Sequence, residues 1–382
     1  MSFKHNNIMT KSLVLLSLWL GAAGQSLAES KFNFQEPVNQ IGRDIYDLHM
    51  LVFWICVVIG VGVFGMMIYS IFTHRKSKGA VASDFHESAK VEVVWTIIPF
   101  LILIAVAIPA TKTLIELEDT SDADMTVKVT ALQWKWKYDY GNGVTFISSL
   151  HPDHNEARRR NSGVDVTKIE HYLLEVDNQL VLPINKKIRF LVTSDDVIHS
   201  FWVPKFAMKK DAIPGYVNET WTTIEKEGVY RGQCTELCGQ DHAFMPIVVN
   251  AKNENDFNAW MDQQKTASAA AAAEAASDKV WSEADLVARG ESIYMGKGGC
   301  FGCHGANGEG VAIFPKLAGS AIANGDAAKH IDVVVNGVAG SAMAAYSGQL
   351  NDLELAAVIT YERKAWGNNA SVVQPADIKA AR

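Results

Sequence analysis

The chain has 382 residues, enough for two or three domains of about 150 residues each. Its 35 basic and 42 acidic residues give a net charge of −7, and no basic block is present that could neutralise a phosphate backbone, which argues against nucleic acid as a partner. Apolar residues gather near the N-terminus, and this uneven distribution predicts a membrane protein.

The first 28 residues have the pattern of a secretory signal peptide. Two lysines precede an apolar run from Leu13 to Ala23, and Ser26 and Ala28 stand at the small-residue spacing of a cleavage site. The alternative, an uncleaved membrane anchor, needs about 20 apolar residues, and this run is shorter. We therefore expect a signal peptide over residues 1–28 and export of the chain that follows.

Two longer apolar runs come next, over residues 51–72 and 93–111, and neither contains a charged residue. Both are long enough to cross a bilayer, so spans are expected at about residues 50–73 and 92–112, within an N-terminal segment of residues 29–121. The loop between them holds most of the nearby positive charge. Its basic residues are Arg75, Lys76, Lys78 and Lys90. Positive loops stay inside, which predicts a hairpin with both long ends outside.

An outer domain is expected over residues 122–265, where short β-rich runs alternate with polar or Gly/Pro turns. This is the pattern of a small β-sandwich or barrel. The runs are MTVKVTAL, HYLLEV, KIRFLVTS, ETWTTIEK and MPIVVNA, and a helix is expected at residues 254–264. A polar insert, HPDHNEARRRNSGVDVTKIE, interrupts them. Its His151 and His154 are candidate ligands, but we interpret the insert as a solvated loop.

The low-complexity stretch TASAAAAAEAASD follows, and it cannot build a core. Residues 266–280 are therefore expected to be a linker, either coil or helix. A second outer domain is expected over residues 281–370. Ser282 and Asn351 each precede an acidic residue by three positions, as in a capping box, and so predict the starts of its first and last helices.

The second outer domain contains GGCFGCHGANGEG, in which Cys300, Cys303 and His304 form C-x-x-C-H, the attachment pattern of a c-type haem. A bare C-x-x-C also suits a disulfide or half of a zinc site, but the adjacent histidine and the predicted export favour haem. The candidates for the sixth iron ligand downstream are Met343 and His330. Met343 is preferred because GSAMAAYSGQL resembles the distal loop of class I cytochromes c.

A second redox site is predicted in GQCTELCGQDHAFMPIVV. Cys234, Cys238, His242 and Met245 combine thiolate, imidazole and thioether ligands, which suit copper. A structural zinc site would rarely use methionine, a bare disulfide would leave the histidine and methionine unexplained, and a single blue-copper centre needs only one cysteine. Two thiolates favour a pair of copper ions, each with its own histidine. His199, in DVIHSFWVP, supplies the second one from a β-rich segment upstream.

With these motifs in order, the chain resembles subunit II of the haem-copper cytochrome c oxidases, of the branch with a fused cytochrome c. The matching stretches are VEVVWTIIP, ALQWKWKYDY, YLLEVDNQLVLP, DVIHSFWVP, KKDAIPGYVNETW and YRGQCTELCGQDHAFMPIVV. The resemblance implies a multidomain membrane protein. Its expected parts are a two-helix transmembrane hairpin, a cupredoxin-like all-β barrel and an all-α class I cytochrome c domain.

The resemblance also implies the cofactors, which are a binuclear CuA centre and a covalent haem c. The implied copper ligands are the bridging Cys234 and Cys238, the terminal His199 and His242, the weak ligand Met245 and the backbone carbonyl of Glu236. In the family, the carboxylate that matches Glu236 also reaches a magnesium ion shared with subunit I.

Two further residues carry over from the family. Trp134, in LQWKW, matches the aromatic residue through which the family accepts electrons from soluble cytochrome c, although Trp134 and Trp136 also suit a packing role. Glu92 stands at the cytoplasmic boundary of the second span, where the family places a carboxylate for proton uptake. The alternative for Glu92 is a merely interfacial position.

The resulting interpretation is the electron-input subunit of a terminal cytochrome c oxidase that couples oxygen reduction to proton pumping. An external donor, such as cytochrome c or a quinol:cytochrome c reductase, reduces haem c, which reduces CuA, which passes electrons to subunit I. This chain lacks the multi-span, histidine-rich core for oxygen chemistry, so it is an enzyme only within the complex. We expect it in a bacterial inner membrane, with both outer domains on the periplasmic side.

Three alternatives share part of these features. A membrane-tethered copper carrier would use the same ligands but has no use for a haem. Nitrous oxide reductase resembles the copper motif but would need a large further domain and no hairpin. Quinol-oxidising relatives of the subunit lack the copper cysteines, so the presence of Cys234 and Cys238 argues against this alternative.

Overall fold

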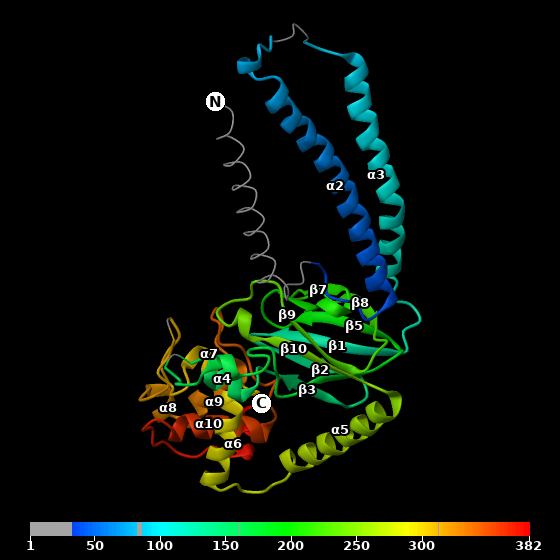
Figure 1. The fold of residues 1–382 in the computed structure, drawn as a ribbon. Helices are drawn as coiled ribbons and strands as arrows, with labels where there is room; N and C mark the ends of the chain where they lie inside the picture. Colours follow the sequence, from blue (N-terminus) through cyan, green and yellow to red (C-terminus); the bar gives the residue numbers. More distant parts are fainter. Residues whose placement is uncertain (1–32, 82–85, 160, 312) are drawn as a thin grey trace. The chain divides into compact units, whose positions relative to one another are not determined.

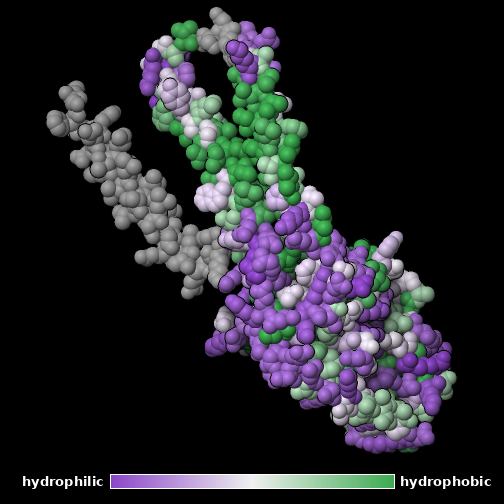
Figure 2. Space-filling view, turned by 90° about the vertical axis from the view of Figure 1, so that its right-hand side faces the viewer, coloured by the Kyte–Doolittle hydropathy of each residue, from purple (hydrophilic) through white to green (hydrophobic). Residues whose placement is uncertain are grey.

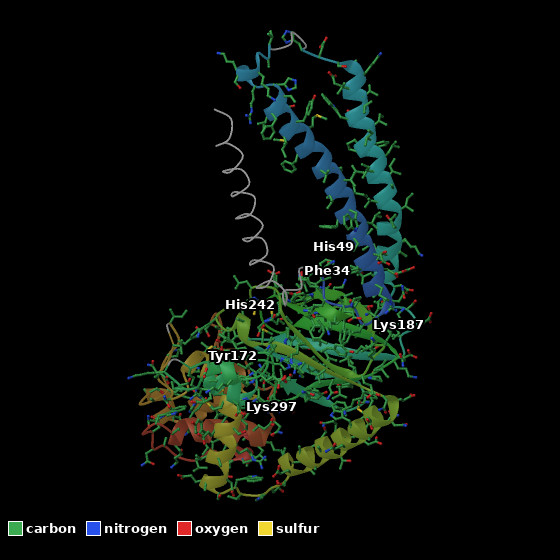
Figure 3. The ribbon with its side chains drawn as sticks, in the orientation of Figure 1. Phe34, His49, Tyr172, Lys187, His242 and Lys297 are labelled. Atoms are coloured by element: carbon green, nitrogen blue, oxygen red, sulfur yellow. The ribbon has the colours of Figure 1, made fainter. Side chains whose placement is uncertain are left out.

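The computed structural model describes residues 33–81, 86–159, 161–311 and 313–382 (Figure 1), and the side chains of these parts are drawn in Figure 3. The signal peptide expected over residues 1–28 lies outside the described residues. Pro37–Arg382 form one compact unit, which holds all the elements considered below.

Two long apolar helices, α2 (Gln40–Thr73) and α3 (Ala89–Glu118), are long and apolar enough to cross a membrane, which confirms the predicted hairpin. Most of their apolar side chains are exposed, and the face in Figure 2 is strongly hydrophobic along both helices, as expected for helices that need lipid or other protein subunits around them. Helix α3 contains Pro99 and Pro109, a feature that membrane helices tolerate better than soluble ones.

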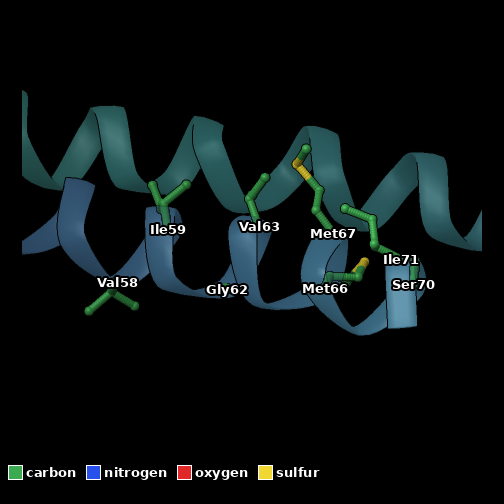
Figure 4. A pocket seen from close by; sticks show the side chains of 8 residues that line it. All are labelled: Val58, Ile59, Gly62, Val63, Met66, Met67, Ser70 and Ile71. Atoms are coloured by element: carbon green, nitrogen blue, oxygen red, sulfur yellow. The ribbon is translucent and has the colours of Figure 1, made fainter. Parts of the chain in front are cut away.

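An apolar groove of about 580 Å³ runs along one face of α2 (Figure 4). The residues that line it are Val58, Ile59, Gly62, Val63, Met66, Met67, Ser70 and Ile71. Gly62 and Ser70 are small, so they leave room between the larger side chains. The groove lies within the apolar run, and Ile59, Val63 and Met67 point towards the neighbouring helix in Figure 4.

Two five-stranded sheets form the next domain, with orders β3-β2-β1-β5-β8 and β4-β10-β9-β6-β7. The first sheet consists of β1 (Met125–Leu132), β2 (Lys135–Asp139), β3 (Thr145–Ser148), β5 (Lys187–Ser194) and β8 (Asn218–Thr223). The second consists of β4 (Leu180–Pro183), β6 (His199–Val203), β7 (Met208–Ala212), β9 (Gly228–Cys234) and β10 (Pro246–Lys252). Both sheets contribute to one core, which confirms the predicted cupredoxin-like all-β domain.

Aromatic residues fill the centre of this core. Trp136 and Tyr138 alternate with polar neighbours along β2 and are fully buried, and both rings contact Phe201 on β6, with centroid distances of 5.3 and 6.5 Å. Burying a large apolar side chain contributes about 1.5–3 kcal/mol. These residues therefore hold the first sheet against the second, next to the strand that begins with His199.

The first and last turns of the hairpin are fixed to this domain. Asn39 caps α2 by accepting from Gly42 N at 2.8 Å, and its amide donates to Phe206 O at 3.1 Å and to Thr222 Oγ1 at 2.9 Å. At the other end, Glu116 O accepts from Trp221 Nε1 at 3.2 Å. The buried contacts of Asn39 and the exposed contact of Trp221 give the two helices a defined junction with the sheets.

The predicted strand HYLLEV is wrong. His171 and Leu173 have positive φ, which breaks an extended run, and only Val176 makes an isolated bridge, to Leu150. The interpretation of the preceding insert as a solvated loop is also wrong in part. It contains helix α4 (Pro152–Ala157), and His154 is buried, where its Nδ1 accepts from Leu173 N at 3.1 Å.

Helix α5 (Glu254–Ala275) begins where a helix was expected but continues through the alanine-rich stretch. Alanine has the highest helix propensity, so a chain of low complexity extends the helix rather than ending it. Phe257, Trp260 and Met261 pack against the sandwich. Residues 276–282, which contain no helix, then lead into the last domain.

The last domain is all-helical, as predicted, and has its own core. Its helices are α6 (Glu283–Met295), α7 (Phe301–His304), α8 (Ala321–Asn324), α9 (Ala327–Asn336), α10 (Asp352–Lys364) and α11 (Pro375–Ala381). Ser282 caps α6, and Asn351 with Glu354 forms a complete capping box at α10. Helix α6 crosses α10 at Gly290, where a side-chain carbon would lie 2.1 Å from Ala357 O.

Candidate metal centre and haem-attachment site

Strand pairing brings the predicted copper ligands together. Cys234 ends β9, and Phe201 on β6 pairs with it, so His199 at the start of β6 lies beside the loop that joins β9 to β10. This loop carries Cys238, His242 and Met245 and is called the copper loop below (residues 235–245). The ligand atoms of His199, Cys234 and Cys238 all lie within 4.8 Å of one another.

The two sulfur atoms are 3.8 Å apart, far beyond the roughly 2.05 Å of a disulfide, so both cysteines are free and buried. Each has an imidazole beside it. Cys234 Sγ lies 3.9 Å from His199 Nδ1, and Cys238 Sγ lies 3.4 Å from His242 Nδ1. Met245 Sδ is 3.6 Å from Cys238 Sγ. The arrangement is a compact pair of sulfurs with one histidine on each side.

The carbonyl of Glu236 faces the same cluster. Its oxygen lies 3.4 Å from Cys234 Sγ, whereas its carboxylate is on the exposed side of the loop. The backbone oxygen therefore points at the sulfur pair, and the side chain is accessible from outside the domain.

Asp196 orients His199 and was not predicted from the sequence. Its Oδ1 lies 2.9 Å from His199 Nε2, and its carboxylate also accepts from the backbone of Gln133 at 2.6 Å and of Val197 at 2.6 Å. A carboxylate can only accept, so Nε2 carries a proton, and Nδ1 is the nitrogen that faces Cys234 and is placed to ligate a metal there. Such a carboxylate behind a histidine is the usual support of a metal ligand.

The thiols of the pair have unequal acidity. The contact with Cys238 lowers the pKa of Cys234 below its usual range, and the same contact, together with burial, raises the pKa of Cys238 above its usual range. One thiolate is thus favoured without a metal, and a cation between the sulfurs would favour the second. Thiolates, imidazoles and a thioether are the donors that soft or borderline ions prefer, so these residues fit copper.

The C-x-x-C-H motif forms α7 and its N-cap, so Cys300, Cys303 and His304 all lie within about one helical turn. Both thiols are free and partly buried. His304 Nδ1 lies 2.8 Å from Pro315 O. Because a carbonyl can only accept, Nδ1 carries the proton and Nε2 is the nitrogen with a free lone pair. The motif thus fits a haem held by two thioethers and one imidazole.

The two candidates for the sixth ligand differ in their surroundings. His330, on α9, is buried and its Nε2 lies 2.9 Å from Glu362 Oε2, inside the helical core. Met343 is partly buried in an irregular segment, where its backbone carbonyl accepts from Val338 N at 2.9 Å. His330 is therefore engaged in a core contact, and Met343 is the more available donor of the two.

The two residues carried over from the family lie in different places. Trp134 lies against the copper loop, where its Nε1 donates to Cys238 O at 3.1 Å. Trp136 is in the core and donates to Met245 O at 3.2 Å. Glu92 is in the first turn of α3, exposed, about 39 Å along the helix from Glu118, near which α3 joins the sandwich.

Three family models match the chain. "Cytochrome C oxidase subunit II, transmembrane domain" matches residues 28–113, and "Cytochrome C oxidase subunit II, periplasmic domain" matches residues 125–252. The helical domain matches "Cytochrome C oxidase, cbb3-type, subunit III" over residues 285–361.

Individual relatives have similar names. The probable cytochrome c oxidase subunit 2 of Rickettsia bellii (strain RML369-C) is 36% identical over 264 residues, which cover 68% of this chain and 93% of the relative. Cytochrome c oxidase subunit 2 of Mycosarcoma maydis is 37% identical over 239 residues, covering 60% and 90%. The crystal structure of the periplasmic domain of subunit II of cytochrome oxidase (CoxB) of Bradyrhizobium japonicum is 42% identical over 38% of this chain and 97% of that one, with a TM-score of 0.34.

Proposed function

Because this chain belongs to the cytochrome c oxidase subunit 2 family, we propose that it takes up electrons at a covalent haem c and passes them through a binuclear CuA centre to subunit I. The chain is a membrane-embedded subunit of a haem-copper oxidase complex and combines a copper-type β domain with a cytochrome c domain. Its role is electron transfer within that complex.

The single observation that carries the copper assignment is the pair of free, buried cysteines 3.8 Å apart with a histidine beside each sulfur. A copper pair bound there supplies a one-electron redox centre. Cys234 and Cys238 would hold both ions, His199 and His242 one each, with Met245 and the Glu236 carbonyl as weak ligands. Asp196 keeps His199 in the required tautomer, and the buried Trp136 shields that ring from water.

The haem would be held by thioethers to Cys300 and Cys303, with His304 and Met343 as the candidate iron ligands. Pro315 O orients His304 in the same way that Asp196 orients His199. The free Nε2 of His304 supports the first assignment, and the engagement of His330 with Glu362 supports Met343 as the second.

The remaining steps concern the partners. An external donor, such as cytochrome c or a quinol:cytochrome c reductase, reduces the haem, and subunit I reduces oxygen to water and pumps protons. The basic loop between α2 and α3 supports an orientation with both outer domains in the periplasm of a bacterial inner membrane. The exposed carboxylate of Glu236 is free to reach a magnesium ion shared with subunit I. The exposed position of Glu92 in the first turn of α3, far along the helix from the sandwich, supports a role in proton uptake at the opposite face of the membrane.

The copper assignment is tested by metal analysis and EPR of the purified complex. The wild-type chain should contain two coppers at this site and give a mixed-valence EPR signal, and Cys234→Ser should abolish that signal. Cys56→Ser, in α2, is the matched control and should leave it unchanged. One bound zinc, or a four-line spectrum of a single copper, would show that the assignment is wrong.

A further inference from the structure

The insert between β3 and β4 has no part in the proposed function, yet it contacts the cytochrome domain. Asn155, in α4, donates from Nδ2 to Met295 O at 3.5 Å, and Arg159 lies 3.5 Å from Met295 Sδ. Met295 is the last residue of α6 and precedes the haem-attachment motif. The insert therefore reaches the segment that carries the haem cysteines.

Arg158 is the central contact of the insert. Its guanidinium donates to both carboxylate oxygens of Asp241, at 2.9 and 3.3 Å, and the two side chains are only 17% and 8% exposed. Asp241 directly precedes His242 in the copper loop. The same guanidinium lies 4.1 Å from the centre of the Phe244 ring and 5.5 Å from that of Phe301. One cation thus contacts both the copper loop and the haem-attachment motif.

Lys135 makes a second connection between the two domains. It begins β2, is 2% exposed, and donates from Nζ to Lys297 O at 3.0 Å and to Gly298 O at 2.8 Å. Its Nζ also lies 5.1 Å from the centre of the Tyr346 ring. The three partners of Lys135 are Lys297, Gly298 and Tyr346, and all of them belong to the cytochrome domain. Lys297 is labelled in Figure 3, as is His242 of the copper loop.

A buried ammonium is costly unless its donors are satisfied, and burial lowers the pKa of Lys135 to about 8. Here the carbonyls that satisfy the donors come from the cytochrome domain. Lys135 is therefore specific for a partner that brings carbonyl groups to this position, and the fused domain does so just ahead of Cys300.

The copper loop and the haem-attachment motif approach closely because Gly302, which has no side chain, lies between them. Gln240 Nε2 donates to Gly302 O at 3.1 Å. A side-chain carbon on Gly302 would lie 3.0 Å from Asp241 Oδ2 and 3.7 Å from the ring of Trp134. A cavity of only about 20 Å³ lies between the domains, room for about one water molecule. The interface is therefore tightly packed.

We propose that Arg158 of the insert and Lys135 form a docking surface for this chain's own cytochrome domain, which holds the haem-attachment motif against the copper loop for electron transfer. The electron-transfer part rests on the proposed function. The occupant is the tethered domain rather than a soluble cytochrome, because its carbonyls and Phe301 already fill the contacts. Trp134 lies under Gly302, so an external donor meets the haem domain rather than this indole.

Amine labelling of the full chain in the solubilised complex tests the docking without using the metal centres. Lys135 should react slowly with an acetylating reagent, relative to the exposed Lys128, because Nζ is buried between the domains. Arg158→Met should raise the relative labelling of Lys135 at least tenfold, as measured by peptide mass spectrometry. The matched control is Arg189→Met, which removes a bidentate pair with Glu219 in the first sheet and should leave Lys135 protected.

The electron-transfer part is tested by following copper reduction after rapid reduction of the haem. Arg158→Met and Lys135→Met should each slow the transfer at least tenfold while the copper EPR signal and the haem spectrum stay as in wild type. Arg158→Lys, which keeps the charge but loses the bidentate fork, should be intermediate. If Arg158→Met disturbs copper binding, Lys135→Met decides, because it leaves the pair of Arg158 and Asp241 intact.

Two results would overturn the proposal. The first is a relative labelling of Lys135 in Arg158→Met equal to that in Arg189→Met. The second is wild-type transfer in both docking variants with their spectra intact. Absence of the copper-pair signal in the wild-type protein would instead contradict the proposed function, and the labelling result would still decide the docking.

Discussion

At the scale of single residues, both candidate redox sites use the same device. At each site, one ring nitrogen of a histidine donates a hydrogen bond to a fixed oxygen, and the other ring nitrogen faces the site. The acceptor is Asp196 Oδ1 for His199 and Pro315 O for His304. The tautomer is therefore set by the protein before any metal or haem is bound. This lowers the cost of ordering the ligand when binding occurs.

The first prediction concerns Asp196. Asp196→Ala should weaken copper binding about 10–100-fold, because His199 loses the acceptor that fixes its tautomer and ring orientation. The measurement is a copper titration of the apoprotein under reducing conditions. Asp195→Ala is the matched control, since Asp195 is exposed and adjacent in sequence. Equal copper affinities in the two variants would contradict the role assigned to Asp196.

A second prediction separates Met343 from His330. Met343→Ala should remove the weak thioether–iron charge-transfer band and lower the reduction potential, since Met/His ligation raises it. His330→Ala should keep the band but destabilise the domain by about 1–3 kcal/mol, because it leaves Glu362 buried without its partner. Loss of the band in His330→Ala, with the band retained in Met343→Ala, would reverse the ligand assignment.

The sequence pattern indicates the candidate ligands, but it does not indicate the residues that orient them. Cys234, Cys238, His242 and Met245 lie within twelve residues of the sequence, so their spacing alone indicated a shared site. Asp196 was missed because nothing in the sequence pattern distinguishes it from Asp195; only the turn before β6 decides which carboxylate faces His199. Arg158 was missed because its partners come from the copper loop and the cytochrome domain, which sequence spacing does not relate.

At the scale of elements, the local sequence pattern predicted correctly those strands and helices whose structure depends mainly on their own residues. The runs MTVKVTAL and KIRFLVTS form β1 and β5 over the same residues. HYLLEV has the composition of a strand but forms a turn, because His171 and Leu173 adopt positive φ above the buried His154. The insert that contains α4 was also not predicted from the sequence, because its stability comes from contacts with other elements rather than from its own sequence pattern.

A third prediction belongs to the crossing of α6 and α10. Gly290→Ala should place a methyl group 2.1 Å from Ala357 O and force the helices apart, at a cost of about 3 kcal/mol or more. Thermal unfolding of the cytochrome domain, followed through the haem absorbance, measures the loss. Gly348→Ala is the control, because a side-chain carbon there meets nothing within 4 Å. Equal unfolding temperatures of the two variants would show that the crossing is not this tight.

At the scale of the whole molecule, we expect the fused domain to replace a diffusing partner. Helix α5 is about 33 Å long, since its 22 residues rise about 1.5 Å each; its first turns pack against the sandwich, and a short irregular segment connects its end to α6. A short tether gives an effective concentration on the order of millimolar. The interface at Lys135 and Arg158 then needs only modest affinity to keep the domain docked.

The central claim is that electrons pass from the haem to the copper centre within one chain. The most direct measurement is flash reduction of the haem, followed by the absorbance of the copper centre, over a tenfold dilution series of the purified complex. Transfer within one chain should be a first-order reaction with one rate constant at every concentration. A rate that falls in proportion to dilution, or full turnover with the native donor by a Cys300→Ser/Cys303→Ser variant that retains its copper, would contradict it.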